Sequence, residues 1–164
     1  MQILIVCTGN TCRSPMGAGL FAQIIEEVGG ATVAAGIRIS SAGTAAIDGQ
    51  PAAREAQEVC REVGCDLSAH RSRRLTRSML GQSDLVLVME EHHRQAVELL
   101  TPELEGKVML LGEMAGQNPG APVADPIGEP LERYREVREQ LAHLLQAVRR
   151  RIEEDGWGGP GLQA

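Results

Sequence analysis

The 164-residue sequence predicts one α/β domain, in which helices cover both faces of a parallel β-sheet. Two observations carry this prediction. Short apolar runs typical of buried strands alternate along the chain with longer segments of helical periodicity. The length suits a single domain, and 43% hydrophobic and 23% charged residues are ordinary for a globular protein. In such folds ligands bind outside the carboxyl ends of the strands, so the loop after the first strand is the first candidate site.

The N-terminal segment predicts a strand, a loop and a helix. Residues Gln2 to Val6 form a short apolar run, typical of a buried parallel strand, which stops at Cys7. Ser14 and Pro15 favour a helix start, with Ser at the N-cap and Pro at the first helical position. Apolar residues then recur at helical spacing until Gly29-Gly30, where we expect the helix to end.

The rest of the chain continues this alternation and contains one long loop. Residues Gly112 to Gly128 are rich in Gly, Pro, Ala and Asn, which predicts a loop of the kind that carries function inside a compact domain. From Leu131 to Ile152, apolar residues at three- and four-residue spacing predict the clearest helix. We expect a domain over residues 1–153 and a flexible C-terminal tail over 154–164. The other expected elements are strands at 37–41, 84–89 and 108–111 and helices at 51–63 and 90–100.

Charge and hydropathy exclude several classes of protein. The formal net charge is -6 and the pI is near 5.2, whereas a general nucleic-acid or anionic-membrane binder needs a basic surface. No apolar run approaches the ~18 residues of a membrane span, and residues Met1 to Val6 lack the basic flank and length of a signal peptide. We expect a cytoplasmic protein with no nucleic-acid or membrane partner, and we expect it to be a monomer.

Four cysteines are too few for the disulfide scaffold of a secreted protein of this size. In a reducing compartment, thiols serve catalysis, metal binding or packing. Both cysteine motifs have the form C-x4-C, whereas structural zinc sites more often show C-x2-C spacing. We therefore expect no metal and no cofactor. The two motifs are Cys7 with Cys12 and Cys60 with Cys65.

The loop between the first strand and the first helix carries the strongest chemical signal. It runs from Cys7 to Ser14 and has the form C-x5-R-S. Backbone N–H groups in such a turn, together with a helix N-terminus, form a concave site for a phosphate-sized anion. Gly9 is able to adopt positive φ there, and the planar fork of Arg13 suits two phosphate oxygens. The same positive field favours a Cys7 thiolate, with a hydroxyl at Ser14 to donate to it, and this indicates covalent phosphoryl transfer.

Phosphoryl transfer also needs an acid that protonates the departing atom. A carboxylic acid on a loop that is able to approach the Cys7 loop is the economical choice. Asp125 lies in the predicted long loop, just before the last helix. Taken alone, this residue would be interpreted as part of a loop-to-helix turn, so its assignment depends on the presence of the Cys7 loop.

Five segments match one known family in the family's own order: Val6–Met16, Ser40–Thr44, His70–Arg73, Asp84–Met89 and Asp125-Pro126. On these segments, which span nearly the whole chain, the sequence resembles the low-molecular-weight protein tyrosine phosphatase family. The resemblance implies a flavodoxin-like three-layer fold with a four-stranded parallel sheet in the order 2-1-3-4 and helices on both faces. It also identifies residues 1–153 as the phosphatase domain.

The resemblance implies a two-step hydrolysis of phosphorylated proteins without metal or cofactor. Cys7 would attack phosphorus and form a cysteinyl-phosphate, with Arg13 holding the phosphate oxygens. Asp125 would protonate the leaving group in this step. The same Asp125 would then activate the water molecule that hydrolyses the intermediate.

The resemblance also implies roles for the residues around the nucleophile. Ser14 would stabilise the thiolate, and Ser41 and His70 would support the loop from behind. Cys12 would form a reversible disulfide with Cys7 under oxidation and protect it from irreversible oxidation. The residues that complete the phosphate-binding loop are Thr8, Gly9, Asn10, Thr11 and Cys12, of which Asn10 would hold the shape of the loop.

Two positions bear on the substrate. Relatives that act on phosphotyrosine generally carry a larger aliphatic residue in place of Thr11, whereas Thr here is similar to the bacterial protein arginine phosphatases. A compact, polar side chain leaves space beside phosphorus for a guanidinium, with which Asp125 would pair. Ile127 stands where the family usually places an aromatic, and the chain has one Phe, one Trp and one Tyr. We therefore expect phosphoarginine in proteins to be the substrate, with Thr11, Asp125 and Ile127 as the specificity residues.

Two other activities stay open at this point. A tyrosine phosphatase of broader specificity is the main alternative. Arsenate reductase, on a similar fold, is a remote one, because it needs redox cysteines after the third strand and no cysteine follows Cys65. His92, His93 and His143 gain no role from the resemblance, and we interpret them as helix-surface or packing residues.

Overall fold

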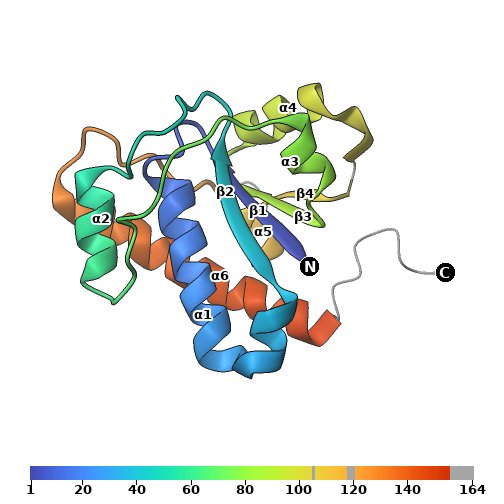
Figure 1. The fold of residues 1–164 in the computed structure, drawn as a ribbon, viewed down its shortest axis with the longest axis horizontal. Helices are drawn as coiled ribbons and strands as arrows, with labels where there is room; N and C mark the ends of the chain where they lie inside the picture. Colours follow the sequence, from blue (N-terminus) through green and yellow to red (C-terminus); the bar gives the residue numbers. More distant parts are fainter. Residues whose placement is uncertain (105, 118–120, 156–164) are drawn as a thin grey trace.

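Four parallel strands form one sheet in the order β2-β1-β3-β4 in the computed structural model, which describes residues 1–104, 106–117 and 121–155 (Figure 1). The central strand β1 pairs with both β2 and β3, and β4 pairs with β3 at the edge. This topology confirms the predicted fold class and strand order. The strands are β1 (Gln2–Cys7), β2 (Arg38–Gly43), β3 (Leu85–Val88) and β4 (Val108–Leu110).

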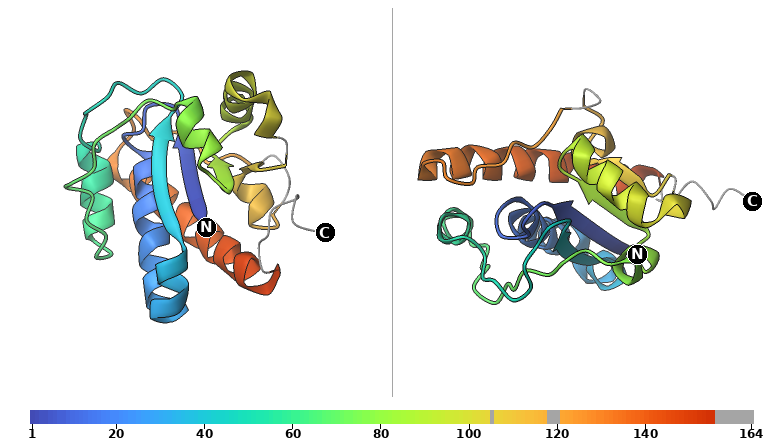
Figure 2. Two further views of the ribbon diagram at one scale, coloured as in Figure 1. Left: turned by 45° about the vertical axis from the view of Figure 1, so that its right-hand side comes forward. Right: turned by 90° about the horizontal axis from the view of Figure 1, so that it is seen from above.

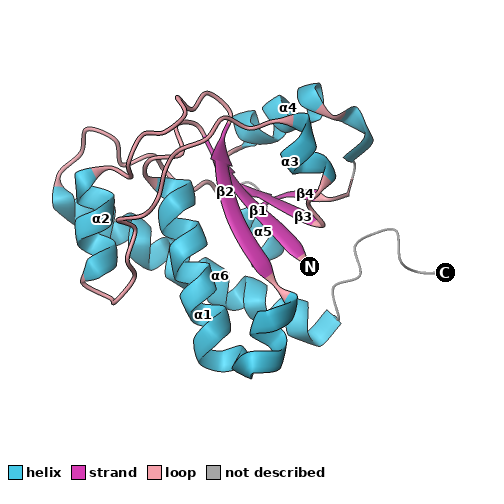
Figure 3. Ribbon diagram, viewed as in Figure 1, coloured by secondary structure: helices cyan, strands magenta, loops and turns pink. Residues whose placement is uncertain are grey.

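Helices lie on both sides of the sheet and give the fold three layers (Figures 2 and 3). Helices α1, α2, α5 and α6 share one core cluster with the sheet, while α3 and α4 contribute to a second cluster on the opposite face. No helix in the described ranges is long and apolar enough to span a membrane. The helices are α1 (Arg13–Gly36), α2 (Arg54–Arg61), α3 (Arg77–Gly81), α4 (Glu91–Leu100), the 3-10 helix η1 (Pro102–Leu104), α5 (Leu111–Met114) and α6 (Leu131–Asp155).

The side chains of β1 alternate between the two cores. Ile3 and Ile5 lie in the cluster beneath α1 and α6, whereas Leu4 and Val6 lie in the cluster shared with α3 and α4. All four side chains are almost completely buried. Burial on both faces explains why this strand is a continuous apolar run in the sequence rather than an alternating one.

The aromatic residues of the described chain serve the core, as their positions in the helical patterns predict. Phe21 of α1 and Tyr134 of α6 are buried in the same cluster. Most of that cluster consists of aliphatic side chains, alanine, methionine and cysteine. These smaller side chains fill the core by close packing in place of aromatic rings. Trp157 lies outside the described residues.

Several helix ends differ from the sequence prediction. Helix α1 continues through Gly29-Gly30 to Gly36. Each glycine costs about 1 kcal/mol relative to alanine in a helix, but the following segment 31–35 is rich in alanine, the strongest helix former. Helix α2 is shorter than predicted, and α6 extends to Asp155, into the expected tail. The remainder of that tail, residues 156–164, lies outside the described part of the chain.

The first helix also begins differently. It starts at Arg13, with Cys12 as its N-cap and no capping hydrogen bond from that side chain. Ser14 therefore lies inside the first turn and is not the N-cap, and its hydroxyl contacts Cys7 and Asn10. The short helices α3, η1 and α5 were not predicted; they have three to five residues each, too few to show a helical period.

The carboxyl end of β2 supports the loop that follows β1. Cys7 is the register partner of Gly43, and the N–H of Thr44 donates to the Cys7 carbonyl at 2.9 Å. A Cβ atom on Gly43 would collide with the carbonyl oxygen of Thr8 and lie 2.9 Å from the amide nitrogen of Asn10. Because both neighbours are backbone atoms, they cannot move aside without shifting the loop. Only glycine fits this contact.

We expect Gly43→Ala to lower the free energy of unfolding by about 1–3 kcal/mol, the usual cost of overpacking. Urea denaturation measures this change. Gly36→Ala is the matched control, because a Cβ at Gly36 meets nothing within 4 Å and alanine is the better helix former, so this variant should lose no stability. Equal stability of the two variants would contradict the close approach of β2 to the loop.

Candidate active site

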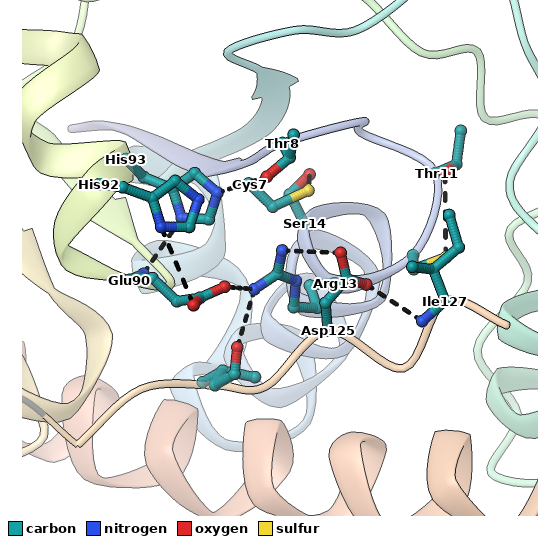
Figure 4. Close-up of polar contacts among 12 residues, drawn as sticks. Cys7, Thr8, Thr11, Arg13, Ser14, Glu90, His92, His93, Asp125 and Ile127 are labelled. Carbon is teal, nitrogen blue, oxygen red and sulfur yellow. Dashed lines mark hydrogen bonds and ion pairs between the residues drawn. The ribbon is translucent and has the colours of Figure 1, made fainter. Parts of the chain in front are cut away.

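The Cys7–Ser14 loop joins the carboxyl end of the central strand to the first turn of α1 (Figure 4). Cys7 closes β1 and is buried. Its Sγ lies 2.9 Å from Ser14 Oγ. The Ser14 oxygen accepts a hydrogen bond from Asn10 Nδ2 at 2.8 Å, so the Ser14 hydroxyl proton is able to point to the sulfur or to the Ala42 carbonyl oxygen, which lies farther away at 3.4 Å. A thiolate at Cys7 would thus have a hydrogen-bond donor behind it.

Asn10 is completely buried and holds the centre of the loop. Its Nδ2 also donates to Ser41 Oγ at 3.0 Å, and its Oδ1 accepts from the N–H of Arg73 at 2.9 Å. With φ of 55°, it is the one residue other than glycine with positive φ among those described. From the sequence, we expected Gly9 to be the residue with positive φ in this loop, but Gly9 does not have it. Asn tolerates the left-handed region because its short polar side chain bonds locally.

His70 reaches the same residue from the other side. Its Nε2 lies 2.8 Å from the carbonyl oxygen of Asn10. Because a carbonyl only accepts, Nε2 carries the proton and donates. Partial burial lowers the pKa of His70, while the bond to Asn10 acts in the opposite direction. The structure thus brings Ser41 and His70 together at Asn10, and their supporting role stays a prediction.

Arg13 is 2% exposed, and its guanidinium is surrounded by acceptors from two other segments. Nη1 pairs with the carboxylate of Glu90 and donates to the carbonyl oxygen of Val123 at 2.9 Å. Nη2 donates to Asp125 Oδ2 at 3.1 Å. The guanidinium thereby connects α1, the end of β3 and the loop before α6. This pairing brings Asp125 to the Cys7 loop, more than a hundred residues away in the chain.

A cavity of about 120 Å³ opens above the loop. Asp125 and Ile127 line it from the opposite side, and the N–H of Ile127 donates to Asp125 Oδ1 at 3.2 Å. The Ile127 side chain is 67% exposed, at the rim. Figure 4 shows Thr11 and Ile127 on the side of the cavity away from Glu90 and His93. The residues contributed by the loop are Cys7, Thr8, Gly9, Thr11, Cys12 and Arg13.

The second thiol of the loop is buried against the last helix. Cys12 Sγ lies 3.5 Å from the Tyr134 hydroxyl. Burial raises the pKa of the Cys12 thiol, and the bond to Tyr134 partly offsets this. Cys7 and Cys12 are both free thiols, so their disulfide stays a prediction. Cys60 and Cys65 are also free and buried, within the core cluster and outside the lining of the cavity.

Two residues of the site were not identified from the sequence. Glu90 pairs with Arg13, and His93 Nε2 lies 2.8 Å from Thr8 Oγ1. His93 is completely buried, which agrees with the expected packing role, but its contact with Thr8 also connects it to the loop, whereas His143 is exposed on α6. Burial, with His92 and Arg13 nearby, lowers the pKa of His93 to about 4. Their position in the sequence could have indicated a role, because both lie within a few residues of the carboxyl end of β3, and ligands bind at that edge of the sheet.

Glu90, His92 and His93 also form a group whose potential metal-ligand atoms lie within 4.8 Å of one another. Both ring nitrogens of His93 are hydrogen-bonded, one to Thr8 and one to the N–H of Glu90. The Glu90 carboxylate is paired with Arg13. A metal ion would have to displace these bonds, so the geometry does not favour a metal at this position.

Comparison with known proteins agrees with this geometry. The family model of low molecular weight phosphotyrosine protein phosphatase matches residues 2–156. A protein-arginine-phosphatase of Geobacillus stearothermophilus is 33% identical, covering 94% of this chain and 97% of the relative. The low molecular weight protein-tyrosine-phosphatase Etp of Escherichia coli K12 is also 33% identical, covering 93% and 90%.

A solved structure gives the same result for the fold. The YwlE arginine phosphatase, as a mutant with a phosphorylated active site serine, superposes with a TM-score of 0.87 at 34% identity, covering 94% of this chain and 97% of that one. Relatives named for either substrate are thus similar to this chain over nearly its full length. The chain belongs to the low molecular weight phosphotyrosine protein phosphatase family and is a hydrolase of phosphorylated proteins.

Proposed function

We propose that this phosphatase hydrolyses phosphoarginine in proteins through a cysteinyl-phosphate intermediate. The observation that carries the proposal is the composition of the cavity wall, in which Thr11 faces the same space as Cys7 and the carboxylate of Asp125. A compact residue with a hydroxyl leaves room beside the phosphoryl group. A carboxylate in the same cavity suits a guanidinium.

In the first step, the Cys7 thiolate attacks phosphorus while the backbone N–H groups of the loop and the Arg13 guanidinium hold the phosphoryl oxygens. The S–P bond forms as the P–N bond breaks. Asp125 donates its proton to the departing guanidino nitrogen. Ser14, 2.9 Å from the sulfur, stabilises the thiolate before the attack.

In the second step, the Asp125 carboxylate takes a proton from a water molecule, and the water oxygen attacks phosphorus. The S–P bond breaks, inorganic phosphate is released and the thiolate of Cys7 returns. Asp125 has the position for both steps, since it lines the cavity and is 38% exposed at its side chain.

The pairing of Asp125 with Arg13 suggests that phosphoryl binding comes before Asp125 acts as an acid. Nη2 of Arg13 donates to Asp125 Oδ2, and the same group would serve a phosphoryl oxygen. We infer that a bound phosphoryl group takes this contact from Asp125. Phosphoryl binding would thus precede the release of the Asp125 carboxyl group toward the leaving group.

The lining of the cavity offers no aromatic side chain among the described residues. Ile127 occupies the rim position, and the two described aromatic side chains, Phe21 and Tyr134, are buried in the core. No described aromatic ring lines the cavity, so a phenol ring would have no stacking partner there. The arginine phosphatases among the relatives support the proposal. The tyrosine phosphatases among them make phosphotyrosine the main alternative.

The experiment that tests the substrate compares kcat/KM for phosphoarginine and phosphotyrosine peptides of the same sequence. We expect the wild type to prefer phosphoarginine and Thr11→Ile to reduce or invert that preference, because added methyl groups fill the space beside phosphorus. The expected change in the ratio is about tenfold or more, the scale set by one or two methylene groups in a pocket.

Thr11→Val is the matched control for this experiment, because it keeps the branched shape and removes only the hydroxyl. If Thr11→Val keeps the wild-type ratio of kcat/KM between the two peptides, the preference depends on the size of the side chain. If its ratio is close to that of Thr11→Ile, the preference depends on the hydrogen bond from the hydroxyl. A preference that is the same in wild type and Thr11→Ile would overturn the role of Thr11. A wild type that prefers phosphotyrosine would replace the proposed substrate with the alternative.

We expect Asp125→Asn to lower kcat about 10²- to 10⁴-fold on phosphopeptides, because the amide cannot donate a proton to the leaving group. The loss should be smaller on p-nitrophenyl phosphate, whose leaving group departs readily without a proton. Steady-state kinetics on both substrates measure this difference. Glu129→Gln, an exposed carboxylate in the same loop, is the control and should retain wild-type rates; an equal loss on both substrates would argue against general acid catalysis by Asp125.

A further inference from the structure

Both ring nitrogens of His93 take part in defined hydrogen bonds inside the protein. The backbone N–H of Glu90 lies 3.1 Å from Nδ1, and Thr8 Oγ1 lies 2.8 Å from Nε2. His93 is in the first turn of α4 and is fully buried. Thr8 is the residue next to the nucleophile and lines the cavity. The contact therefore connects α4 directly to the Cys7 loop.

These two bonds fix the tautomer of the ring. A backbone N–H can only donate, so Nδ1 accepts from Glu90 and carries no proton in the neutral ring. The single ring proton is then on Nε2, which donates to Thr8. Since the pKa of His93 is lowered to about 4, the ring is neutral over the physiological range and this arrangement persists.

The tautomer in turn decides what the Thr8 hydroxyl does. Its oxygen accepts the hydrogen bond from His93 Nε2, so its own proton is free to be donated elsewhere. We propose that His93 is a positioning residue that holds the Thr8 hydroxyl as a hydrogen-bond donor to the phosphoryl oxygens bound in the cavity. This inference rests on the phosphate-binding role of the loop in the proposed function. It adds one side-chain donor to the backbone N–H groups and Arg13.

The same short segment controls both ends of the loop. The carboxylate of Glu90 pairs with Arg13 at the start of α1, and the ring of His93 bonds to Thr8 just after β1. Figure 4 shows Glu90 and His93 on one side of the cavity, with Thr8 and Arg13 between them and Asp125. The turn that leads from β3 into α4 therefore positions two phosphate-binding side chains by separate contacts.

The experiment measures inhibition of p-nitrophenyl phosphate hydrolysis by inorganic phosphate for Thr8→Val, His93→Leu and the double variant. We expect Thr8→Val to raise the inhibition constant of phosphate about 10- to 100-fold, as for the loss of one hydrogen bond to a charged group. His93→Leu should raise it as well. The double variant should be no worse than Thr8→Val alone, because His93 acts through Thr8.

Two conservative variants test whether phosphate binding depends on the Thr8 hydroxyl and on the N–H donor of His93. Thr8→Ser keeps the hydroxyl and should bind phosphate nearly as the wild type does. His93→Gln offers an amide N–H close to the position of ring Nε2 and should recover most of the loss seen in His93→Leu. His143→Leu, an exposed histidine on α6, is the matched control and should leave the inhibition constant unchanged.

Two results would overturn the inference: an unchanged inhibition constant in Thr8→Val, or additive effects of the two substitutions in the double variant. If His93→Leu does not fold, His93→Asn replaces it, because the shorter amide does not extend to the position of ring Nε2 and should raise the inhibition constant where His93→Gln does not; equal constants for His93→Asn and His93→Gln would overturn the role of His93. Inorganic phosphate and p-nitrophenyl phosphate carry no guanidinium, so these results do not depend on the preference for phosphoarginine. Failure of the covalent mechanism itself would appear separately, as turnover that survives Cys7→Ser.

Discussion

The buried charge of Arg13 is the constraint around which the carboxyl edge of the sheet is arranged. A guanidinium that is 2% exposed would destabilise the fold unless its donors were matched inside the protein. The matching groups come from the segment after β3, through Glu90, and from the loop before α6, through Val123 and Asp125. Satisfying one side chain thus brings together three parts of the chain that are distant in sequence. The cavity lies where these parts meet.

The Cys7 loop keeps its shape through contacts of a different kind. Asn10 occupies the left-handed region and saturates its side chain with hydrogen bonds to Ser14, Ser41 and Arg73, while Gly43 lets β2 approach the loop backbone. The loop therefore has its concave form before any anion enters, because internal bonds and not the ligand determine it. A preorganised site of this kind loses little free energy to reorganisation when charge develops on the phosphoryl group.

One cavity is lined both by the Cys7–Arg13 loop and by the residues that we propose select the substrate, Thr11, Asp125 and Ile127. Membership of the family follows from a match over residues 2–156, and the relatives include phosphatases named for arginine and for tyrosine at the same 33% identity. Overall similarity cannot separate the two groups, because most of the chain serves the fold and the loop that they share. Under the proposed function, the distinction would depend on a few side chains that line the cavity, Thr11 and Ile127 among them.

The alternation of strands and helices and the C-x5-R-S loop could be predicted from the chain alone, because both depend on local periodicity and on adjacent residues. The need for an acid beside the loop pointed to Asp125, and the resemblance to a family supplied the strand order. The sequence did not locate the end of α1, since glycine penalties and alanine propensities nearly balance there, and it assigned positive φ to Gly9 where Asn10 has it. Only the tertiary structure showed that Glu90 and His93 belong to the site. Their side chains acquire a role from contacts with Arg13 and Thr8, about eighty residues away in the chain, and no local pattern encodes a contact between neighbouring parallel strands.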